Sequence, residues 1–104
     1  IFNAPLKTGM KSKEFLKIFD QKILKPIDKF KPEIILISAG FDAHTRDPLA
    51  NINLESEDFY EITKRIVDLA NIHSEGRVIS FLEGGYDLLA LSESIKHHLL
   101  ALKS

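Results

Sequence analysis

Apolar residues recur along the chain in two different patterns, and their alternation predicts the order of the structural elements. A spacing of three and four residues, typical of amphipathic helices, marks three segments. These segments are residues 12–30, a stretch that opens at Glu55 or Ser56 and ends before Gly76, and Leu88–Leu102. A short, continuous apolar run, Ile34–Ile37, and a second predicted strand, Val78–Leu82, lie between them. The continuous run favours a strand buried on both faces of a parallel sheet, and the alternation of strands with helices predicts an α/β fold with right-handed crossovers.

Proline residues divide the first helical segment. Ser12 is the predicted N-cap, and Pro26 lies inside the apolar pattern, where it either kinks one long helix or starts a second one. Pro32 biases Lys31 away from helical geometry and so ends the element. In the other two helices the apolar stripes are predicted at Phe59, Ile62, Ile66 and Leu69, and at Leu91, Ile95, Leu99 and Leu102.

The residues best suited to chemistry follow the two predicted strands. Ser38–His44 follows the first strand, and Glu83–Asp87 follows the second. Ligands of open α/β sheets bind outside the carboxyl ends of the strands. Because parallel strands end at the same side of a sheet, the sequence predicts that Asp42 and Tyr86 lie at the same end.

Asp42 follows a buried strand and a glycine, and its carboxylate could ligate a metal ion, act as a base or cap a helix. The alternative is structural, since a loop aspartate usually binds backbone amides. Asp42 and His44 also stand two residues apart, which places both side chains on one side of an extended segment. Two ligands do not complete a zinc site, however, because catalytic zinc normally takes three protein ligands and a water.

Two glycines, Gly84 and Gly85, directly precede Tyr86, and paired glycines let a backbone approach a ligand closely. A tyrosine held after them could donate a hydrogen bond to a developing oxyanion. It could equally pack over the turn with its hydroxyl in water. A phosphate-binding loop is a third interpretation, although the full glycine signatures of nucleotide-binding loops are absent.

Composition limits the classes of function. The chain of 104 residues is 44% hydrophobic and 28% charged, as in ordinary globular proteins, and its net charge of −1 argues against a nucleic-acid-binding protein. No apolar run approaches the roughly 20 residues that cross a bilayer. The absence of cysteine excludes a thiol nucleophile and fits a reducing compartment, which we expect to be the cytoplasm. We expect His73, His97 and His98 at the surface or at helix ends.

Two motifs resemble one known family. Pro32–His44, followed by Asp47-Pro48-Leu49, resembles a signature of class II-like histone deacetylases, acetoin-utilisation proteins and acetylpolyamine amidohydrolases. Leu82–Leu88 resembles the second C-terminal signature of the same family. The resemblance covers nearly the whole chain, and two motifs at the right separation are more specific than either alone. It implies an arginase/deacetylase-like three-layer α/β fold, in which helices cover both faces of a central parallel sheet.

The resemblance also implies roles for individual residues. Asp42 matches the family's third zinc ligand, and Tyr86 matches the tyrosine that hydrogen-bonds the substrate carbonyl oxygen. Leu49 matches a position at the pocket entrance, and Gly84 and Gly85 match glycines beside the metal site. His44 matches no ligand of the family. In the family an Asp-x-His pair and a histidine pair supply the other zinc ligands and the general base, and both precede the region that this chain resembles.

Residues 1–104 are therefore expected to be the C-terminal third of a single deacetylase domain whose N-terminal two-thirds are absent. The parent would be a Zn2+-dependent amidohydrolase acting on acetyl-lysine or acetylated polyamines. The fragment alone would be inactive, would not hold Zn2+ by itself and would self-associate through its uncovered apolar surface. No nucleic acid or membrane partner is expected. The alternative is a non-catalytic α/β interaction module derived from the same fold, for which Asp42 and Tyr86 would have no use.

Overall fold

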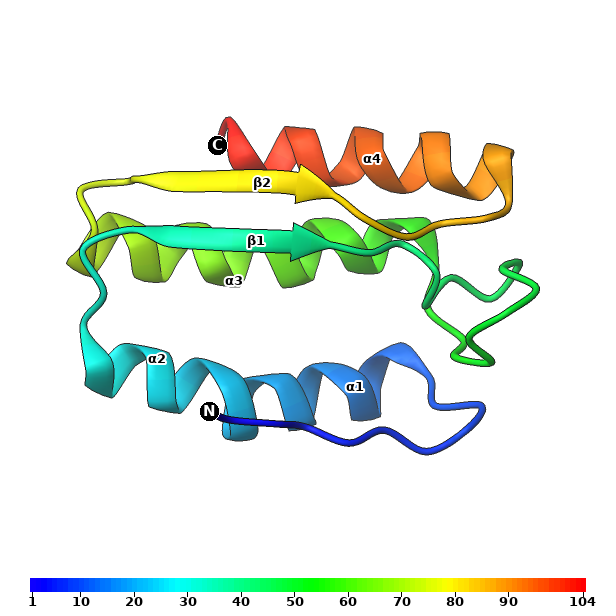
Figure 1. Cartoon of the computed structure of the whole chain (residues 1–104), viewed down its shortest axis with the longest axis horizontal. Coiled ribbons are helices and arrows are strands. Elements are labelled where there is room, and N and C mark those ends of the chain that lie inside the picture. Colours follow the sequence, from blue (N-terminus) through cyan, green and yellow to red (C-terminus); the bar gives the residue numbers. More distant parts are fainter.

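The computed structural model describes residues 1–104 and confirms the predicted order of elements. These are α1 (Ser12–Phe19), a π-helical turn η1 (Asp20–Leu24), α2 (Lys25–Phe30), β1 (Ile35–Ala39), α3 (Ser56–His73), β2 (Val78–Leu82) and α4 (Leu88–Leu102). Figure 1 shows the two strands side by side and pointing the same way, with the helices running lengthwise along them. No helix of the chain combines the length and the apolar character needed to cross a bilayer.

The two strands form a parallel pair, as predicted. The register runs from Ile35 opposite Val78 to Ala39 opposite Leu82, so both strands end at the same level. The first strand begins one residue later and ends two residues later than the apolar run alone predicts. The parallel pairing places the loops after β1 and β2 next to each other, which is the arrangement on which a shared site depends.

The prediction that the first strand is buried on both faces is wrong for this chain. Alternate residues of β1, such as Ile37 and Ala39, pack against α3 and α4 through a core that includes Phe41, Leu54 and Phe59. On the opposite face Leu36 is 63% exposed and Phe81 is 55% exposed. The chain has helices for only one face of its two-stranded sheet, so it forms two layers of an α/β fold.

The residues buried in α3 and α4 are mostly small. The buried residues of α4 are Ala90, Ser94, His98 and Ala101, not the leucine stripe predicted for it. Leu99, which belongs to that predicted stripe, is exposed. Small residues at these positions let the two helix axes approach, whereas Ile95, Leu99 and Leu102 line a hollow with Ser80 and Leu82 of β2, which is too narrow to cover them.

The first helical segment differs from its prediction in two places. Lys11 rather than Ser12 is the N-cap of α1, and no side chain caps that helix. The π-helical turn lies just before Pro26, which lacks an N–H and needs more room than an α-helical turn provides. Lys31 adopts a left-handed conformation with φ of 56°, which confirms that the helix ends before Pro32.

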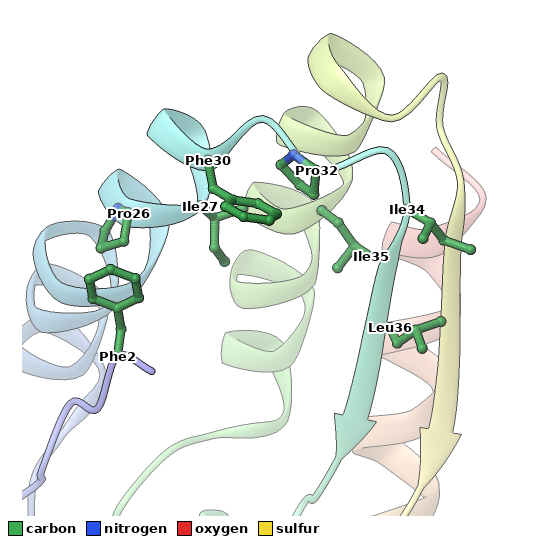
Figure 2. Close-up of a pocket in the computed structure, with 8 residues that line it drawn as sticks. All are labelled: Phe2, Pro26, Ile27, Phe30, Pro32, Ile34, Ile35 and Leu36. Atoms are coloured by element: carbon green, nitrogen blue, oxygen red, sulfur yellow. The ribbon is translucent and has the colours of Figure 1, made fainter.

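An apolar hollow of about 340 Å³ opens between α2 and the start of β1 (Figure 2). It is lined by Phe2, Pro26, Ile27, Phe30, Pro32, Ile34, Ile35 and Leu36. None of these side chains can titrate, ligate a metal or donate a hydrogen bond. The hollow therefore carries no chemistry, and it lies at the opposite end of β1 from Asp42.

Candidate functional site

Two backbone hydrogen bonds join the loops that follow β1 and β2. The Phe41 N–H donates to the Gly84 carbonyl at 2.8 Å, and the Glu83 N–H donates to the Ala39 carbonyl at 2.9 Å. These bonds extend the parallel ladder past the ends of both strands. They place Asp42 beside Gly84 and confirm that the two candidate segments lie together.

Gly84 lies between the Asp42 carboxylate and the Tyr86 hydroxyl. A Cβ atom built on Gly84 would stand 3.2 Å from Asp42 Oδ1 and 3.5 Å from the Tyr86 hydroxyl oxygen. A Cβ atom on Gly40 would stand 3.0 Å from the same Oδ1. The carboxylate therefore rests against bare backbone on Gly40 and Gly84, and a substrate atom near Gly84 would meet both functional groups.

Gly85 turns the chain from this site into α4. Its φ of +135° is a conformation that residues with a side chain rarely adopt. A Cβ atom there would stand only 2.7 Å from Leu91 Cδ1. The two glycines thus have different reasons to be glycine: Gly84 leaves room for functional groups, and Gly85 permits a close turn.

Three aspartates lie in these two loops, and two of them bind backbone amides. Asp87 accepts a hydrogen bond from the Ala90 N–H at 2.9 Å and caps α4. Asp47 accepts one from the Leu49 N–H at 2.8 Å and one from the Tyr86 N–H at 2.9 Å. Asp42 is the third aspartate. Its carboxylate makes no hydrogen bond and no ion pair within the chain, so the amide-binding interpretation does not describe it.

The candidate site is open. The Tyr86 side chain makes no hydrogen bond within the chain, and the residue is 56% exposed; Leu49 is 64% exposed. None of the hollows in the surface is lined by Asp42, Leu49 or Tyr86. The structure therefore brings Asp42, Gly84 and Tyr86 together, and the Asp47 carboxylate joins the Leu49 main chain to that of Tyr86.

Sequence reasoning assigned no role to Asp47. The run Asp47-Pro48-Leu49 does carry a local signal, because an aspartate often accepts a hydrogen bond from the amide two residues later. Its bond to Tyr86 crosses 39 residues of sequence, and no local pattern could have indicated it.

His44 is buried, and both of its ring nitrogens are engaged. Nδ1 accepts a hydrogen bond from the Arg46 N–H at 3.0 Å, so the proton resides on Nε2, which donates to the Ser56 hydroxyl at 2.9 Å. Ser56 in turn donates to Glu93 at 3.1 Å. No ring lone pair remains for a metal, which argues against an Asp42–His44 ligand pair.

Glu93 ends this chain of hydrogen bonds at an ion pair. The Arg46 guanidinium, 2.6 Å away, holds the pKa of the Glu93 carboxyl below its usual value, and the Ser56 hydroxyl adds to that shift. The network links the loop after β1 to both α3 and α4. Its role in this chain is to hold that loop in place.

His98 contradicts the prediction of a surface position. It is 6% exposed, and its ring lies between α3 and β2. The Thr63 hydroxyl donates to the Phe59 carbonyl at 2.6 Å, so His98 Nδ1 donates to Thr63 and Nε2 accepts from Ser80. Burial lowers the pKa of His98, and the neutral ring links α3 to β2 through its two hydrogen bonds.

The fit of a metal ion depends on how many ligands converge. No three His, Asp or Glu side chains of this chain lie close enough together to hold one. Asp42 can supply a single carboxylate ligand from an otherwise unused side chain. A complete zinc site would need further ligands from outside the chain.

Comparisons with known proteins agree with the geometry. The family model described as "Histone deacetylase domain" matches residues 1–102. Histone deacetylase 14, chloroplastic, of Arabidopsis thaliana is 42% identical over 96% of this chain and 24% of its own length. The histone deacetylase-like amidohydrolase of Pseudomonas aeruginosa is 34% identical over 81% of this chain and 22% of its own length. The chain thus spans about a quarter of the length of these two relatives.

Solved structures show the same fold. The crystal structure of the HDA15 HD domain superimposes with a TM-score of 0.87 at 30% identity, covering 98% of this chain and 28% of that one. The match includes both loops that carry the candidate site residues. Together with the motif order and the pairing of β1 with β2, these similarities show that the chain belongs to the histone deacetylase family.

Proposed function

We propose that the full-length protein is a zinc-dependent amidohydrolase that removes acetyl groups from acetyl-lysine or acetylated polyamines. Family membership supports deacetylation in general. The observation that carries the proposal is the convergence of Asp42 and Tyr86 on Gly84, with the Asp42 carboxylate unused by any other contact in the chain. A non-catalytic module would have no reason to leave a carboxylate unpaired beside a tyrosine hydroxyl.

In this proposal Asp42 is a zinc ligand. Its Oδ1 lies against Gly40 and Gly84, whose lack of side chains keeps the carboxylate accessible. A bound zinc ion would activate a water molecule and polarise the amide carbonyl of the substrate. The remaining ligands and the general base would come from parts of the protein outside these residues, so the fragment by itself would be inactive.

Tyr86 supplies the hydrogen bond that the reaction needs at the carbonyl oxygen. Tyr86 is 56% exposed, and its hydroxyl lies beside Gly84 and makes no hydrogen bond within the chain. As water attacks the amide carbon, negative charge develops on the carbonyl oxygen, and a neutral donor at that position stabilises it. Gly84 forms the base of the site without projecting a side chain into it. Leu49 forms an apolar rim that would contact the aliphatic part of an acetylated amine.

The test uses the full-length protein and two substrates, an acetyl-lysine peptide and an N-acetylated polyamine. We expect release of acetate that depends on bound zinc. Tyr86→Phe removes one hydroxyl with little change in volume, and it should lower kcat by about 100- to 1,000-fold while zinc content stays unchanged. A Tyr86→Phe enzyme with wild-type kcat on both substrates would overturn the proposal and favour the interaction module.

The cellular setting is part of the proposal as well. The absence of cysteine fits a reducing compartment such as the cytoplasm. Fractionation of cells that express the full-length protein tests this prediction, and recovery of the protein in an organelle would contradict it.

A further inference from the structure

Asp47 is buried, with 9% exposure, yet it faces no cation. Its two carboxylate oxygens have separate partners: Oδ1 accepts from the Leu49 N–H at 2.8 Å, and Oδ2 accepts from the Tyr86 N–H at 2.9 Å. Its own N–H donates to the His44 carbonyl at 2.9 Å. Two backbone amides are therefore the polar partners of this buried carboxylate within the chain.

The two bonds differ in what they achieve. The bond to Leu49 closes a local turn, which many loop aspartates do. The bond to Tyr86 joins the loop after β1 to the loop after β2, across 39 residues of sequence. Hydrogen bonds from amides to a charged carboxylate are about twice as strong as neutral ones, so the carboxylate is a firm connection between the loops.

Tyr86 needs such a connection because little else holds it. Its side chain is 56% exposed and makes no hydrogen bond within the chain. Gly84 and Gly85 precede it, and glycines leave the backbone free to adopt many conformations. Asp87, which follows it, is fixed as the N-cap of α4. The Asp47–Tyr86 bond is the contact that anchors the tyrosine's own main chain.

We propose that Asp47 is a positioning residue for the deacetylation site. Its carboxylate binds the Tyr86 main chain and so fixes the Tyr86 hydroxyl beside Gly84 and Asp42. The same carboxylate binds the Leu49 main chain at the rim of the site. This inference rests on the proposed function, because it assigns Asp47 to the support of Tyr86 in that reaction. Asp47 itself does not touch the reacting atoms.

The test is Asp47→Asn in the full-length enzyme. Asparagine has the same shape, but one of its two acceptor oxygens becomes an NH2 group, so one of the two amides loses its acceptor. Changes to residues that orient a metal-site group typically cost about 10- to 100-fold in activity, and we expect a loss of kcat in this range. Zinc content should be unchanged, because the hydrogen bonds of Asp47 go to the Leu49 and Tyr86 main chains and not to Asp42. Asp68→Asn is the matched control, since Asp68 pairs only with Lys64 on the surface of α3.

A double-mutant cycle distinguishes positioning from a general effect on the fold. If Asp47 acts through the Tyr86 hydroxyl, Asp47→Asn should cost little further kcat once Tyr86→Phe has removed that hydroxyl. If Asp47 only stabilises the loop, it should lower kcat by the same factor in both backgrounds, and that additivity would overturn the inference. A rise in KM with unchanged kcat would also overturn it, because the carboxylate would then serve only Leu49.

Asp47→Glu covers the case in which Asp47→Asn fails to fold. It keeps the charge and both acceptor oxygens but displaces them by one methylene. We expect kcat between those of the wild type and Asp47→Asn, again with little further loss in the Tyr86→Phe background. If Asp47→Glu and Asp47→Asn both keep the wild-type kcat while Tyr86→Phe is slow, the role of Asp47 is rejected. The proposed function would still stand. Wild-type kcat in Tyr86→Phe would reject both.

Discussion

The Asp42 carboxylate and the Tyr86 hydroxyl face each other across Gly84: both lie within 3.5 Å of the point where a Cβ atom on that glycine would stand. Forty-four residues separate the two side chains in sequence, and the parallel register of β1 and β2 brings them together. The close approach of both groups to one backbone position makes the site sensitive to single methyl groups.

Gly84→Ala should therefore impair function more than stability. The new Cβ would press on Asp42 Oδ1 at 3.2 Å and displace it by a few tenths of an ångström. We expect a loss of activity of about tenfold or more with nearly unchanged Tm, since misplacement of a reacting group by 1 Å can cost about 100-fold. Enzyme kinetics and thermal unfolding of the full-length variant measure both quantities.

Gly85→Ala is the contrasting variant. Its Cβ would stand 2.7 Å from Leu91, and its φ of +135° is strained for any residue with a side chain. Such strain costs about 1–3 kcal/mol, so Tm should fall clearly. Equal Tm values for the two variants would contradict the distinction between a glycine that leaves room for functional groups and a glycine that permits a close turn.

Asp42→Ala should lower zinc content and activity together. The substitution removes a proposed ligand but no hydrogen bond that the fold uses, so Tm of the metal-free protein should be close to wild type. Added zinc should restore part of the rate, because a weakened site refills at higher metal concentration. Metal analysis by mass spectrometry checks this prediction. An Asp42→Ala protein with one tightly bound zinc per chain would rule out the ligand role.

His98 should make the protein less stable as the pH falls below about 6.5. Burial lowers the pKa of His98 in the folded state. As the pH falls below the ordinary histidine pKa of 6.5, the unfolded chain therefore binds more protons than the folded chain. Acidification therefore favours unfolding, and stability is recovered as the pH rises. We expect Tm to fall between pH 7 and pH 5.5, and His98→Gln to reduce this dependence.

His97→Gln is the control for the same measurement, because the neighbouring His97 has no hydrogen-bond partner within the chain. It should leave the pH dependence of Tm unchanged. If the two variants shift that dependence equally, burial of His98 is not its cause.

The chain expressed alone should self-associate. One face of its sheet carries exposed apolar side chains, with Leu36 and Phe81 prominent among them, and a sheet of two strands has two open edges. Sedimentation velocity should show species larger than the monomer, and Leu36→Lys with Phe81→Lys should reduce them. Leu88→Lys, at an exposed position on α4, is the matched control. A stable monomer of the unmodified chain at high concentration would contradict the prediction.

The sequence by itself determined the order of elements, the parallel pairing and the common end of the sheet for Asp42 and Tyr86. These features follow from local signals: apolar periodicity sets the type of each element, prolines and glycines set the boundaries, and chirality sets the crossover. The two motifs were sufficient to identify the family. The candidate residues could also be selected from local signals, because they follow directly after the two predicted strands.

Only the tertiary structure decided which polar side chains are committed to the fold. Asp42, Asp47 and Asp87 look alike in sequence, but Asp47 holds Tyr86 across 39 residues of sequence and Asp87 caps α4, which leaves Asp42 unpaired. His98 likewise reads as a polar residue of an amphipathic helix, yet Thr63 and Ser80 satisfy both of its nitrogens. The physical reason is that burial and hydrogen bonding depend on partners from other elements. Neither the period of a segment nor the type of a residue contains that information.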